Sequence, residues 1–80
     1  MSAEDDVEKL LEEMISSQRE RLLALARRIE PDLTPDDLLQ PHDHPSLEKS
    51  PNFNFEDGIL AGYLAFRAAF RANRNSDRDK

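Results

Sequence analysis

His42, Asp43 and His44 form the one cluster in the sequence whose residue types commonly bind metal ions. Imidazole nitrogens bind zinc, nickel or copper, and a carboxylate can complete such a site. Histidines two positions apart face opposite ways in an extended strand, so they reach one ion only in a turn. Because the chain has no cysteine and no third histidine, further ligands would be acids or water. A polar loop is therefore the main interpretation, and a metal or small-ligand site at His42 and His44 is an alternative.

No arrangement of residues typical of an active site stands out. The six serines fall where helix ends, polar faces or loops are expected. Gly58 and Gly62 are the only glycines, too few for a glycine-rich phosphate loop. Paired acids such as Asp36 and Asp37 do not converge on one point when they are adjacent in a helix. We therefore expect a protein that is not an enzyme and needs no cofactor.

The one basic stripe in the sequence consists of Arg67, Arg71 and Arg74, with Phe66 and Phe70 nearby. Nucleic-acid binding would use such a stripe, with the aromatic rings stacking on bases. The formal net charge of −6 disfavours this role, because binding to phosphate backbones or anionic lipid needs a basic surface. A solvated helix face is the simpler interpretation, and a nucleic-acid accessory role is an alternative that the charge disfavours.

The sequence also bears on where the chain acts. No apolar run approaches the roughly 18 residues that a membrane span requires. The first ten residues lack the apolar segment of a secretory signal, and the absence of cysteine is compatible with a reducing compartment. We expect a cytoplasmic protein that does not contact a membrane.

Two long amphipathic helices must position these residues. The first is predicted over residues 3–29, because Ser2 is a suitable N-cap and Pro31 prevents the helix from continuing. Its apolar positions include a seam that steps by four and three residues, as in a coiled coil. The members of this seam are Leu11, Ile15, Gln18, Leu22, Leu25 and Ile29. Such a seam predicts a partner helix of comparable length.

A connector over residues 30–53 holds all five prolines. Thr34 before Pro35, followed by two acids, predicts a short helical turn over residues 35–39. A second, weaker turn is predicted after Pro45. Four leucines are expected to attach this connector to the helices: Leu33, Leu38, Leu39 and Leu47.

A last helix is predicted over residues 54–73, capped by Asn54, and a disordered tail over 76–80 completes a single domain of residues 1–75. On a helical wheel this helix carries three stripes. An aromatic and aliphatic stripe contains Ile59, Tyr63, Phe66 and Phe70. A small-residue stripe contains Gly58, Gly62, Ala65, Ala69 and Ala72. The third stripe contains Leu60, Leu64, Arg67, Arg71 and Arg74.

The small-residue stripe indicates how this helix is used. Its first half is apolar almost all round, which is typical of a buried helix. A glycine inside a helix costs about 1 kcal/mol relative to alanine, so two on one face suggest close approach by another backbone. The alternative is that Gly58 relieves crowding in the first turn and the alanines face solvent.

These elements predict an all-α fold, an antiparallel helical hairpin with a proline-rich connector that carries one or two short helical turns. Both helices are acidic at the start and basic at the end, so antiparallel packing places opposite charges together. Because 80 residues bury only a small core, we expect assembly as a dimeric bundle. The expected function is protein–protein interaction with itself, as a homodimer, or with a helix of a larger protein. The expected interaction residues are Gly58, Gly62, Tyr63, Ala65, Phe66 and Phe70.

Overall fold

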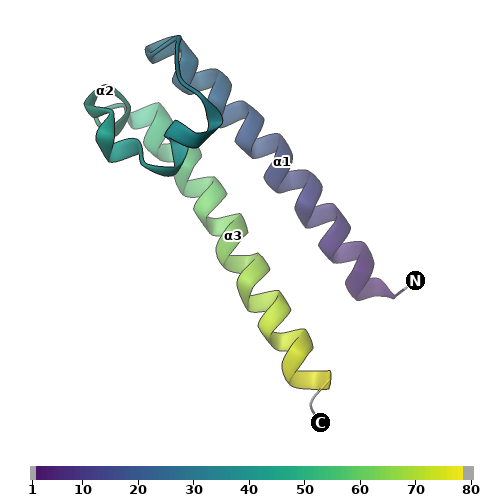
Figure 1. The fold of residues 1–80 in the computed structure, drawn as a ribbon. Helices are drawn as coiled ribbons and strands as arrows, with labels where there is room; N and C mark the ends of the chain where they lie inside the picture. Colours follow the sequence, from purple (N-terminus) through teal and green to yellow (C-terminus); the bar gives the residue numbers. More distant parts are fainter. Residues whose placement is uncertain (1, 79–80) are drawn as a thin grey trace.

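The computed structural model describes residues 2–78 as five helical elements, and these residues contain no strand. In chain order the elements are α1 (Ala3–Ile29), η1 (Pro35–Leu39), η2 (Pro41–Asp43), α2 (Pro45–Glu48) and α3 (Pro51–Arg78). The two long helices run antiparallel, and the short elements close one end of the hairpin while both termini lie at the other (Figure 1). The predicted all-α hairpin with short helical turns in its connector is therefore confirmed.

Helix α1 has the bounds that the sequence predicted. The Ser2 hydroxyl accepts a hydrogen bond from the backbone N–H of Asp5 at 3.2 Å, and the helix ends at Ile29. The first four seam residues are buried, as expected. Further along, Ala26 is fully buried, whereas the predicted seam residues Leu25 and Ile29 are half-buried at the edge of the core. The seam therefore shifts by one residue where α1 meets the connector.

The connector folds into more turns than predicted. Helix η1 and helix α2 lie where Thr34–Pro35 and Pro45 predict them, and η2 is an additional turn between them. The Asp37 carboxylate accepts hydrogen bonds from the backbone N–H and the hydroxyl of Thr34 at 2.9 and 3.1 Å. The bond from the Thr34 backbone lowers the pKa of Asp37. This reciprocal cap fixes the start of the η1 turn.

The connector leucines differ in burial. Leu33 and Leu47 are buried in the core, and Leu38 packs against it. Leu39 is 78% exposed, so the expectation that it attaches the connector to the helices is wrong. A 3₁₀ helix has about three residues per turn, and the adjacent residues Leu38 and Leu39 therefore point in different directions.

The hydrophobic core lies at the connector end of the hairpin. Every element except the 3₁₀ turns contributes a buried side chain to it, together with the loop that follows α1. Its members are Leu22, Ala26, Leu33, Leu47 and Phe53. This cluster joins α1 to α3 through the connector.

Helix α3 begins earlier and ends later than predicted. It starts at Pro51, and the Ser50 hydroxyl accepts a hydrogen bond from the backbone N–H of Phe53 at 3.2 Å. The predicted cap Asn54 lies inside the helix and donates to the backbone carbonyl of Glu48. The helix continues to Arg78 rather than ending at residue 73. Of the predicted tail, residues 79 and 80 lie outside the described part of the chain.

Candidate functional site

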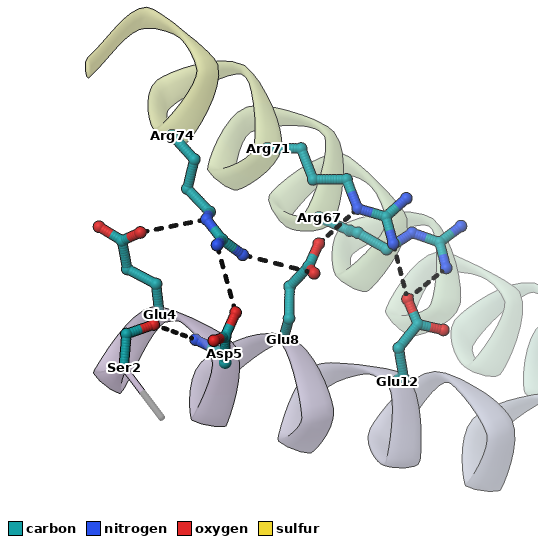
Figure 2. A network of polar contacts seen from close by, with 8 residues as sticks. All are labelled: Ser2, Glu4, Asp5, Glu8, Glu12, Arg67, Arg71 and Arg74. Atoms are coloured by element: carbon teal, nitrogen blue, oxygen red, sulfur yellow. Dashed lines mark hydrogen bonds and ion pairs between the residues drawn. The ribbon is translucent and has the colours of Figure 1, made fainter. Parts of the chain in front are cut away.

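The arginine stripe of α3 faces α1, where the sequence suggested a solvated face. Figure 2 shows the three guanidinium groups reaching across to acidic side chains on the first turns of α1. Arg67 Nη1 lies 2.8 Å from Glu12 Oε1, and Arg74 Nη2 lies 3.2 Å from Asp5 Oδ1. Arg71 lies between them and contacts both Glu8 and Glu12. The charges align the helices antiparallel, as the sequence predicted.

These ion pairs shift the pKa values of Glu12 and Arg71. The hydrogen bond from Arg67 lowers the pKa of Glu12, and the bond to Glu8 raises the pKa of Arg71. Arg74 Nε lies 3.1 Å from Glu4 Oε2 as an ion pair, although the angles are not those of a hydrogen bond. Because each guanidinium already faces carboxylates, the stripe offers little free positive charge to a phosphate backbone.

The two histidines of the cluster differ in exposure and contacts. His44 Nδ1 lies 2.8 Å from Glu30 Oε2, and the Ser46 hydroxyl donates to the other oxygen of Glu30. His44 therefore links the connector to Glu30, which directly follows α1, while His42 is exposed on the η2 turn. Among residues 2–76, whose side chains the structure describes, no three acids, histidines or cysteines are grouped in a way that could hold a metal ion.

The small-residue stripe lies on the far side of α3 from α1. Gly58, Gly62 and Ala65 are all exposed, and a Cβ added at either glycine would meet nothing within 4 Å. The reason is geometric, since turning the Leu60, Leu64 and arginine stripe toward α1 puts the opposite stripe outside. Close backbone contact at this face therefore does not occur within the described chain.

An apolar groove opens between the two helices on one side of the hairpin, toward the termini. It has a volume of about 400 Å³. We call it the Leu10 groove, and its lining residues are Val7, Leu10, Leu11, Met14, Tyr63 and Phe66. Because the seam of α1 points at α3, the adjacent apolar stripe of α1 lies at the edge of the contact and borders the groove.

The side chains around this groove are unusually exposed for their size. Val7, Leu10 and Met14 are 38%, 57% and 39% exposed, and Phe66 is 53% exposed. The Phe66 and Phe70 rings stack with centroids 5.9 Å apart, and the Arg74 guanidinium lies 5.9 Å from the Phe70 centroid. The aromatic stripe is thereby held in place while one edge of it remains open to solvent.

A second, larger groove of about 690 Å³ lies between α1, α3 and the connector. We call it the Leu38 groove. Leu38, Leu39 and Leu64 contribute apolar lining, while Arg19 and Asp57 are among the charged residues beside them. It combines the exposed Leu39 side chain with ionisable groups, whereas the Leu10 groove is lined by apolar and aromatic side chains alone.

Two of the residues that the sequence predicted to take part in interaction lie in the Leu10 groove. Tyr63 and Phe66 were expected interaction residues and line it, whereas Phe70 is half-buried beside it. Val7, Leu10 and Met14 were not expected there. The signal was nevertheless present, because these three residues step by three and four beside the seam, and one partner helix cannot cover both stripes.

No family model, curated protein or solved structure matches the chain. Within residues 2–78, no helix combines the length and the apolar character that a membrane crossing requires.

Proposed function

We propose that this chain is a non-enzymatic protein–protein interaction module that binds through the Leu10 groove and the aromatic stripe beside it. The observation that supports this function is the gathering of four large, exposed apolar side chains from two helices over one groove: Val7, Leu10, Met14 and Phe66. Single exposed apolar residues are normal on protein surfaces, but a contiguous patch of them is typical of an interaction site.

The character of the groove supports a helical or aromatic-rich partner surface. Methionine and aromatic side chains are enriched at protein interfaces, and Met14, Tyr63 and Phe66 supply both kinds here. A groove between two helices accepts a third helix through side chains spaced by three and four residues. The proposed function therefore requires no catalytic group, cofactor or free basic patch.

Site-specific photo-crosslinking in cells that make the protein tests this function. A photoreactive phenylalanine analogue replaces Leu10 in one variant and Lys9 in the other, and both native residues are exposed on α1. Adjacent helical residues point about 100° apart, so the Lys9 position samples the same helix away from the groove. We expect crosslinked protein adducts at position 10 and few at position 9. Adducts at neither position, or equally at both, would contradict the proposal.

A further inference from the structure

The chain has more surface than a compact monomer of its size. Its Cα radius of gyration is 15.4 Å, whereas a compact chain of this length has about 12 Å. Its solvent-accessible surface is 5821 Å², against about 4,900 Å² for a folded monomer of the same mass. The difference, about 900 Å², is close to the roughly 800 Å² that each partner buries in a stable interface. One partner of ordinary size would restore a normal ratio of surface to volume.

The aromatic stripe of α3 is nearly symmetric about its own centre. Tyr63 lies in the Leu10 groove. Ile59 precedes Tyr63 by four residues, and Phe66 and Phe70 follow it by three and seven. Phe55, four residues before Ile59, extends the stripe at its start. A twofold axis through Tyr63 would thus place this stripe against the same stripe of another molecule. Apolar side chains would then contact apolar side chains along its length.

Two charges on α1 have a matching arrangement about Met14. On α1, Asp6 precedes Met14 by eight residues and Arg21 follows it by seven. A twofold rotation near Met14 would bring Asp6 of one copy beside Arg21 of the other. Both residues are exposed, and the nearest carboxylate oxygen to Arg21, on Glu56, is 3.9 Å away. An acid at one end and a base at the other make this surface complementary to itself, and such charges favour one orientation over others.

We propose that the occupant of the Leu10 groove is a second copy of this chain, related by a twofold axis that passes near Met14 and Tyr63. Each α1 then runs antiparallel to the α1 of the partner, and each α3 antiparallel to the other α3. The two hairpins form a four-helix bundle in which all neighbouring helices are antiparallel. This inference rests on the interaction function proposed above and names the partner.

Sedimentation equilibrium of the purified full chain tests the occupant. We expect the wild type to be a dimer at tens of micromolar. Leu10→Lys, in the groove, should weaken the dimer by about tenfold or more, whereas Leu39→Lys, an exposed leucine in the other groove, should leave the dissociation constant unchanged. Circular dichroism checks that both variants keep their helices, as expected for exposed positions.

Disulfide crosslinking tests the axis, because the chain has no cysteine and one introduced cysteine can pair only between molecules. Met14→Cys should give a disulfide-linked dimer on mild oxidation, since residues near a twofold axis approach their own copies. Glu20→Cys, exposed on α1, should not. A dimer that fails to link through Met14→Cys would overturn the proposed axis.

Two other outcomes would overturn the second copy as occupant. One is a wild-type chain that stays monomeric up to about 1 mM, a concentration far above the dissociation constants of specific dimers. The other is a dimer lost in Leu39→Lys and kept in Leu10→Lys. If the chain is monomeric but position 10 crosslinks to a different protein in cells, the interaction function stands and only the identity of the partner is wrong.

Discussion

The two ends of the hairpin are built differently. At the connector end, side chains from α1, the connector, α2 and α3 enclose a cluster whose members are at most 3% exposed. At the termini end only two helices meet, and Leu11 and Ile15 are the buried apolar residues between them. The arginine stripe of α3 pairs with acids of α1 on one side of this contact. The Leu10 groove lies on the other side.

This difference separates the end of the hairpin that holds the core from the end where we propose that a partner binds. Burial of apolar side chains supplies most of the stability of a small domain, so the connector end should dominate the free energy of unfolding. Exposed ion pairs contribute little to stability but do favour one helix orientation. The termini end therefore keeps its helices aligned while leaving apolar surface available, which is the combination that an interaction module needs.

Substitution of a core phenylalanine should have the largest effect on stability. Phe53 is 1% exposed in the connector-end core, whereas Phe55, two residues later, is 68% exposed. Phe53→Ala should lower the free energy of unfolding by about 3–5 kcal/mol, because it leaves a cavity among all the core elements. Phe55→Ala should change it by about 0.5 kcal/mol or less. Urea unfolding of dilute protein measures both, and equal losses would contradict the division between the two ends.

Much of the fold was predictable because its signals are local. Ser2 and Pro31 bound α1, and Thr34–Pro35 starts η1, since capping and proline stereochemistry act over only a few residues. The start of α3 had a local signal too. Ser50 followed by Pro51 is a stronger helix start than Asn54, because serine caps the helix and proline fits its first position.

The faces of α3 were less predictable, because they depend on contacts between residues far apart in the chain. The sequence shows three stripes on this helix but does not show which one meets α1. Ion pairs between the two helices decide this. They join Glu12 with Arg67 and Asp5 with Arg74, residues more than fifty positions apart in the chain. Once these ion pairs turn the arginines inward, the glycines must face outward. Val7, Leu10 and Met14, whose spacing is present in the sequence, then lie beside Tyr63 and Phe66.

Replacing an outward-facing glycine by alanine should change the free energy of unfolding less than Phe53→Ala does, and should raise it rather than lower it. A Cβ at Gly62 would meet nothing within 4 Å. Gly62→Ala should therefore raise the free energy of unfolding by about 0.5–1 kcal/mol, because alanine loses less backbone entropy in a helix. Gly58→Ala should raise the free energy of unfolding by a similar amount. A loss of stability or of dimer in either variant would instead indicate that another backbone packs closely on the small-residue stripe, as the sequence first suggested.

The ion pairs of the arginine stripe should have the smallest effect on stability, and this effect should depend on pH. The Arg67 hydrogen bond lowers the pKa of Glu12 below its ordinary value of 4.5, so the folded chain binds this proton less readily than the unfolded chain. The contribution of Glu12 is therefore complete above that ordinary value and is lost as the pH falls through the lower folded pKa.

Melting temperatures recorded between about pH 2.5 and pH 6 isolate this contribution. Glu12→Gln should melt slightly below the wild type at pH 6 and approach it at the acidic end, because protonation removes the same charge. Glu13→Gln is the matched control, since Glu13 is exposed and makes no ion pair among the side chains of residues 2–76. If Glu12→Gln follows the wild type at every pH, the ion pairs align the helices without stabilising them.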